Sequence, residues 1–136
     1  MKKILWPGII SGAVILILSM GISCVFMSMP SVVADYNNAH LMRTWRDPLI
    51  SLFFVYPFLL GLALAWAWDK SKALFEGSAW NRGTNFGLAY FVISAIPGMM
   101  VTFGSFPLSL LTIVCWTESC FISAVAVGWI LANMNA

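Results

Sequence analysis

Residues Leu108–Leu131 read LSLLTIVCWTESCFISAVAVGWIL, an apolar run that contains one charged side chain, Glu118. A helix needs about 20 predominantly apolar residues to cross the hydrocarbon core of a bilayer, and this run is long enough. A carboxylate near the bilayer centre costs on the order of 3 kcal/mol on insertion scales, so such residues usually face a partner or a wet cavity. The stretch therefore predicts a transmembrane helix that carries an unusual polar site.

The rest of the chain has the same apolar character. Of its 136 residues, 61% are hydrophobic and 9% are charged, whereas soluble domains carry roughly 25% charged residues. The charges cluster between uncharged stretches that are each long enough to span a bilayer. We therefore predict an all-α membrane protein, a single domain over residues 1–136, with four spans in an up-down bundle. The predicted spans are Pro7–Met27, Pro48–Trp68, Gly83–Phe103 and Leu108–Leu131.

The placement of lysine and arginine predicts the orientation. Four spans put both termini on one side, together with the segment Asp69–Arg82, which we expect to lie along the headgroups. That side carries Lys2, Lys3, Lys70, Lys72 and Arg82, and the other side carries only Arg43 and Arg46. The positive-inside rule then places both termini in the cytoplasm. The first apolar stretch exceeds the core of a signal peptide, so we expect it to be an uncleaved helix.

Small residues recur at four-residue spacing in every span. Such pairs let helix backbones approach closely, which drives association where lipid removes the hydrophobic effect between helices. We expect helix packing at Gly8 and Gly12, Gly61 and Ala65, Gly83 and Gly87, and Ala124 and Gly128. With both termini in the cytoplasm, all four pairs lie in the cytoplasmic half. The pattern therefore predicts a bundle that is narrow on that side and wider on the other.

Glu118 is the leading candidate for a functional polar site. Residue counting puts it at the depth of Tyr56 and Ser94, and Cys115 shares its helix face. One interpretation is a carboxylate that binds a proton or cation at the floor of an outward-facing cavity, with Tyr56 and Ser94 as hydrogen-bond partners. The other is a protonated glutamate that donates a hydrogen bond between helices, worth about 1 kcal/mol. The sequence leaves both interpretations open.

The segment Ser28–Asp47 is predicted to be the longest irregular loop and holds the second concentration of polar residues. Its candidate residues are Asp35, His40, Arg43, Arg46 and Asp47. We expect a solvated loop that Arg43, Arg46 and Asp47 anchor at the membrane interface. A metal held by Asp35, His40 and Asp47 is the less favoured alternative, because a single histidine without a second His or Cys at ligand spacing is a weak signal. We therefore predict no metal and no cofactor.

Motifs for catalysis are missing from the sequence, which has no phosphate-binding glycine loop, Ser–His–Asp set or zinc motif. No basic face outside the loops predicts nucleic-acid binding. The stretches Trp68-Asp69, Asn81-Arg82-Gly83, Phe86-Gly87-Leu88 and Ile96-Pro97-Gly98 resemble small prokaryotic four-helix integral membrane proteins of unknown activity. That resemblance covers the middle third of the chain and implies an all-helical, multi-pass protein of the inner membrane.

Two functions are consistent with these features. We favour a non-enzymatic structural or accessory protein that lies in the lipid bilayer and associates, helix to helix, with its own copy or with a larger membrane complex. The alternative is a small proton- or cation-coupled carrier or channel that uses Glu118. Association is favoured because a monomer of four helices has little room for a translocation path.

Overall fold

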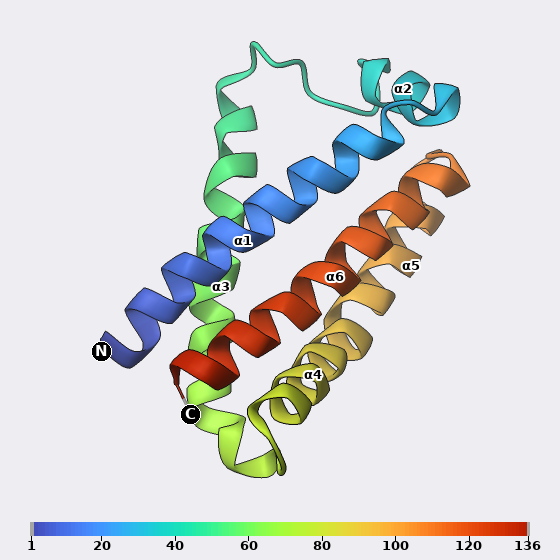
Figure 1. Ribbon diagram of the computed structural model, residues 1–136. Coiled ribbons are helices and arrows are strands. Elements are labelled where there is room, and N and C mark those ends of the chain that lie inside the picture. Colours follow the sequence, from blue (N-terminus) through green and yellow to red (C-terminus); the bar gives the residue numbers. More distant parts are fainter. Residues whose placement is uncertain (1, 136) are drawn as a thin grey trace.

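The computed structural model describes residues 2–135, and it is helical with short connections (Figure 1). Four helical segments are long and apolar enough to cross a membrane: α1 (Lys2–Phe26), the segment Pro48–Leu74 with α3 (Leu52–Ser71), the segment Ala79–Ser105 with α4 (Ala79–Tyr90) and α5 (Ile96–Ser105), and α6 (Leu110–Met134). A short helix, α2 (Pro30–Asn37), follows α1. The prediction of an all-α protein with four candidate membrane spans is confirmed.

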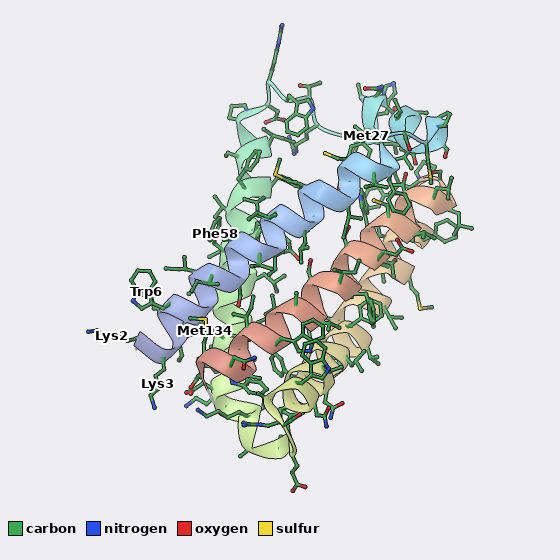
Figure 2. The ribbon with its side chains drawn as sticks, in the orientation of Figure 1. Lys2, Lys3, Trp6, Met27, Phe58 and Met134 are labelled. Carbon is green, nitrogen blue, oxygen red and sulfur yellow. The ribbon has the colours of Figure 1, made fainter. Side chains whose placement is uncertain are left out.

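The helices α1 and α6 form the centre of the bundle and run in opposite directions (Figure 1). Helix α3 packs across α1, and α4 packs along α6. Both chain ends lie at one end of the bundle, where Figure 2 shows Lys2, Lys3 and Met134, while Met27 lies at the opposite end of α1. We call these the termini end and the α2 end.

The main cluster of buried apolar side chains lies toward the termini end. Trp68 of α3 and Leu131 of α6 are fully buried, and Phe86 of α4 is 7% exposed. The Trp68 and Phe86 rings meet edge to face with centroids 5.2 Å apart, a favourable arrangement for aromatic pairs. The cluster also contains Ile15 of α1 and therefore joins all four spans.

Glycines allow the closest approaches between helices. Between α1 and α3, a Cβ added to Gly8 would lie 2.9 Å from the Cα of Leu62. Between α4 and α6, a Cβ added to Gly83 would lie 2.6 Å from the carbonyl oxygen of Gly128. Side chains at these positions would collide with backbone atoms, so the glycines allow a spacing that larger residues would not.

These close crossings lie in the half of the bundle near the termini. Toward the α2 end, a Cβ added to Gly21, Gly98 or Gly104 would meet nothing within 4 Å. Residues Leu52–Tyr56 are exposed, because this part of α3 diverges from the other helices (Figure 1). The close glycine crossings therefore lie toward the termini end, and α3 diverges from the other helices at the α2 end. A bundle that is wider as a whole at the α2 end stays a prediction. The assignment of the tight half to the cytoplasm stays a prediction.

The helices extend further than the apolar runs. Helix α3 and the turn that follows it continue to Leu74, and α4 begins at Ala79, so residues 69–82 are largely helical. Their location along the headgroups stays a prediction. Residues 28–47 contain α2 and are therefore not wholly irregular. In both cases the backbone stays helical in polar sequence, because hydrogen bonding within a helix does not depend on the apolar run that defines a span.

Candidate functional site

Glu118 lies on the outward face of α6. Its side chain is exposed, and its carboxylate forms no hydrogen bond or ion pair with any of residues 2–135. Its neighbours along this face are exposed apolar residues at three- or four-residue spacing, so they form one continuous strip on the helix. We call this strip the Glu118 stripe; it consists of Leu111, Val114, Glu118, Phe121 and Ile122.

The depth of Glu118 makes its exposure unusual. Ile122 is the middle residue of α6 (Leu110–Met134), and Glu118 precedes it by one helical turn, about 6 Å along the axis. This position is well inside a hydrocarbon core of about 30 Å. Ionisable residues at such depth almost always face the interior of a bundle or a polar partner. In the single chain, Glu118 does neither.

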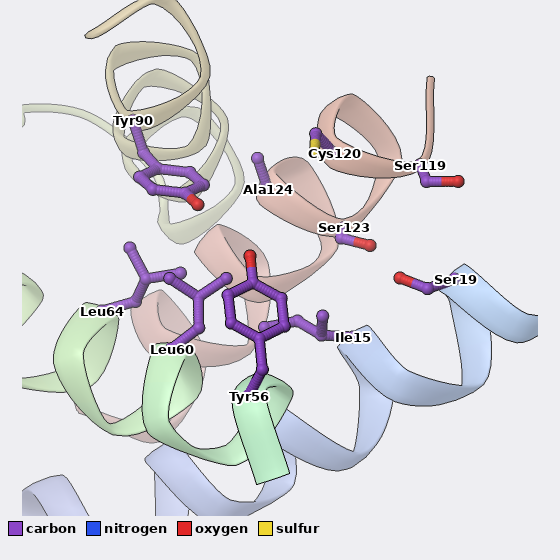
Figure 3. Close-up of a pocket in the computed structure, with 10 residues that line it drawn as sticks. All are labelled: Ile15, Ser19, Tyr56, Leu60, Leu64, Tyr90, Ser119, Cys120, Ser123 and Ala124. Carbon is purple, nitrogen blue, oxygen red and sulfur yellow. The ribbon is translucent and has the colours of Figure 1, made fainter. Parts of the chain in front are cut away.

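A cavity of about 70 Å³ lies in the middle of the bundle between α1, α3, α4 and α6 (Figure 3). No residue of its lining is charged. The hydroxyls of Tyr56 and Tyr90 face each other, and those of Ser19 and Ser123 point toward each other across the gap between α1 and α6 (Figure 3). The lining consists of Ile15, Ser19, Tyr56, Leu60, Leu64, Tyr90, Ser119, Cys120, Ser123 and Ala124.

The structure does not gather the four residues of the predicted intramembrane site. Tyr56 lines the cavity, whereas Glu118 is not among the lining residues. Ser94 is exposed and interacts with Tyr90, one turn earlier in the chain, rather than with Glu118. Cys115 is fully buried. This corrects the expected grouping: α6 is rotated so that its carboxylate faces outward, and Glu118 does not line the cavity that Tyr56 lines.

The sequence interpretation missed Tyr90, Ser119 and Ser123 as members of a polar site. Tyr90 directly precedes a π-helical segment, Phe91–Ala95, and such segments inside α-helices are frequent at functional sites. Ser119 and Ser123 are four residues apart and therefore share one face of α6. That spacing is the signal that could have indicated a polar strip facing into the bundle.

At the α2 end, Asp35 joins α2 to the start of α6. Its Oδ2 accepts hydrogen bonds from the Ser109 N–H at 2.8 Å and from the Thr112 hydroxyl at 2.6 Å. Burial acts to raise the pKa of Asp35, but these hydrogen bonds outweigh it and hold the pKa below its ordinary value. Beside it, the Trp116 Nε1–H donates to the Tyr36 hydroxyl at 2.8 Å. Helix α2 therefore caps α6 through side chains.

The other candidate residues of this region form local contacts. Arg43 donates to Asp47 at 2.6 Å, and Asp47 accepts from the Leu49 N–H at 2.9 Å at the start of the second span. The Leu49 N–H and the Arg43 guanidinium hold the pKa of Asp47 below its ordinary value. His40 and Arg46 are exposed. Within residues 2–135, no three His, Cys, Asp or Glu side chains are grouped so that they could hold a metal ion.

A second polar cluster, which the sequence interpretation missed, joins α3 to the end of α6. The Trp68 Nε1–H donates to the backbone carbonyl of Asn135 at 2.8 Å. The Asn135 side chain accepts from Lys72 Nζ at 2.9 Å and donates to Asp69 at 3.1 Å. These bonds hold the end of the chain against the second span.

Comparison with models of protein families finds no match, and no curated protein or solved structure matches the chain. Function is therefore inferred from the geometry of residues 2–135. The structure has two distinct polar features: an outward-facing carboxylate on α6 and an uncharged cavity between the four spans.

Proposed function

We propose that this chain is a non-enzymatic accessory protein of the prokaryotic inner membrane that assembles with another transmembrane helix through the Glu118 stripe. The observation that carries the proposal is the exposed carboxylate, about 6 Å from the middle of α6. Lipid chains offer no hydrogen bond to a carboxyl group, and contact with them costs on the order of 3 kcal/mol. A helix that brings a polar group to this depth removes that cost.

The form of the stripe supports a helix as the partner. Leu111, Val114, Glu118, Phe121 and Ile122 alternate at three- and four-residue spacing, which is the spacing of the seam between two helices that cross at a small angle. A single polar residue in such a seam fixes the register of the two helices at some cost in stability. Glu118 has this position in the stripe.

Two kinds of partner fit the stripe. A second copy of the chain would bring a second Glu118 to the interface, where two like carboxyl groups disfavour double ionisation and can share a proton. A different membrane protein would offer a hydroxyl, amide or basic side chain instead. Both possibilities belong to the same proposal, since each covers Glu118 with a helix.

The carrier alternative gains less support from the geometry. Proton- or cation-coupled transport through Glu118 needs this carboxylate beside a cavity, and Glu118 does not line the cavity between the four spans.

The orientation of the chain in the membrane is a further part of the proposal. The termini end carries most of the lysine and arginine, which favours a cytoplasmic location for both termini.

Site-specific photo-crosslinking in native membranes tests the proposal. Benzoylphenylalanine at Val114 lies on the Glu118 stripe, and the same group at Leu59 lies on an exposed part of α3. We expect a protein adduct from position 114, a weaker or absent one from position 59, and loss of the first adduct in Glu118→Leu. The mass of the adduct separates a second copy from another protein. Equal adducts from both positions, or an adduct that survives Glu118→Leu, would contradict the proposal.

A further inference from the structure

Two buried serine hydroxyls, those of Ser11 and Ser123, have no hydrogen-bond partner among residues 2–135, whereas Ser119 interacts with Cys115 on the same helix. Ser119 and Ser123 are 8% and 6% exposed, and both line the cavity between the four spans. Ser11 is fully buried and does not line it. A buried hydroxyl without a partner loses the hydrogen bonds that it makes in water. The Ser123 hydroxyl points into the gap toward Ser19, whereas the Ser119 hydroxyl is turned away from it (Figure 3), so Ser123 is the group that points to a ligand.

The cavity lining defines the chemistry of that ligand. It presents hydroxyls from α1, α3, α4 and α6, each of which can donate and accept a hydrogen bond. It presents no charged group, so an ion would lack a countercharge there. The ligand is therefore small, uncharged and able both to donate and to accept.

The volume of the cavity limits the size of the ligand. A water molecule occupies about 30 Å³ in the liquid, and a buried water typically forms about three hydrogen bonds to polar groups. The cavity volume is about 70 Å³. Ser19 and Ser123 point toward each other, and Tyr56 and Tyr90 form a second facing pair (Figure 3). The cavity therefore offers the room and the partners for more than one water molecule.

We propose that this cavity is a binding site for water in the middle of the four spans, where the bound molecules satisfy Ser123 and link α6 to α1 and to the tyrosine pair. Water is the only hydrogen-bonding molecule abundant enough to reach such a site without a dedicated supply. The site is separate from the Glu118 stripe and does not depend on the association proposed above.

Hydroxyl-radical footprinting by X-ray radiolysis tests the site with water itself as the probe. Radicals that form from bound water oxidise the side chains beside it, and mass spectrometry of the full chain in nanodiscs locates the products. Ile15 lines the cavity and is 4% exposed, whereas Ile113 does not line it and is 8% exposed. We expect Ile15 to be oxidised several-fold faster than Ile113. Equal rates, or a faster rate at Ile113, would overturn the proposal.

Alanine substitutions give a second test. Removal of a hydrated hydroxyl should lower the midpoint temperature of unfolding, whereas removal of a dry hydroxyl without a partner should not. Ser123→Ala removes hydrogen bonds to water if the site is hydrated, so the unfolding midpoint should fall. Ser11→Ala is the matched control, since it removes a buried hydroxyl that is unpartnered and away from the cavity, and its midpoint should stay level or rise. A midpoint for Ser123→Ala that matches or exceeds that of Ser11→Ala would overturn the proposal.

Discussion

The crossing of α4 and α6 allows a quantitative prediction about what holds the bundle together. A Cβ at Gly128 would collide with the carbonyl oxygen of Gly83 and lie 2.9 Å from its carbonyl carbon. Because these are backbone atoms, no side-chain rotation relieves the contact, and the two helices must separate. Overpacking costs about 1–3 kcal/mol, and the better helix propensity of alanine returns up to about 1 kcal/mol. We expect Gly128→Ala to lower the free energy of unfolding by about 1–2 kcal/mol.

Gly21→Ala is the matched control, because a Cβ at Gly21 meets nothing within 4 Å. It should leave the free energy of unfolding unchanged or raise it by up to about 1 kcal/mol. Unfolding in mixed micelles with increasing dodecyl sulfate, followed by circular dichroism, compares both variants with the wild type. If Gly128→Ala proves as stable as Gly21→Ala, the close backbone contact between α4 and α6 does not limit the packing.

Two further predictions concern the polar contacts at the ends of the bundle. Asp35→Asn should lower the free energy of unfolding by about 1 kcal/mol, because it weakens the hydrogen bonds from Ser109 and Thr112. Because the pKa of Asp35 is lower in the folded than in the unfolded protein, this stabilisation is complete above the unfolded pKa of about 3.9 and is lost as the pH falls through the folded pKa. The melting temperatures of wild type and variant should therefore converge in acid. A difference in melting temperature that stays constant with pH would refute this. Asn135→Ala removes the side-chain hydrogen bonds to Lys72 and Asp69. Amide hydrogen exchange should therefore become faster in the last turn of α6. Unchanged exchange rates in that turn would show that these hydrogen bonds do not hold the end of the helix.

The number of spans could be predicted from sequence because it depends on a local property. Uncharged runs of spanning length separate the charge clusters, and each run is helical because a lipid-exposed backbone must satisfy its own hydrogen bonds. The small residues that lie at the crossings were also visible as four-residue repeats. Gly83 and Gly87 contact Gly128 and Ala124 in the structure, which places both predicted pairs in one crossing.

The rotation of α6 could not be predicted in the same way. Most of its positions are apolar all round the helix, so no apolar stripe marks the buried side, and both Glu118 and Ser123 were candidates for the interior. The neighbouring helices decide between them. Helix α4 packs where Gly128 and Ala124 leave room, α1 packs on the side of Ser119 and Ser123, and Glu118 is left outside.

The contacts at the two ends of the bundle were beyond sequence reasoning for a different reason. Asp35 is 74 residues from Ser109, and Trp68 is 67 residues from Asn135. No local pattern pairs residues so distant. Helix α2 gave one local signal, a proline at its first turn, but eight residues between two longer spans look like a loop on composition alone.

The mass of the assembly extracted from native membranes tests most directly whether a helix covers Glu118. Copolymer nanodiscs keep neighbouring proteins and lipid together, and native mass spectrometry of their contents weighs each complex. We expect the wild type in a complex heavier than the 15.0 kDa of one chain, and Glu118→Leu mainly as the single chain. A wild type found only as a single chain, with Glu118→Leu more stable than wild type, would show that the carboxylate faces lipid and would contradict the proposed association.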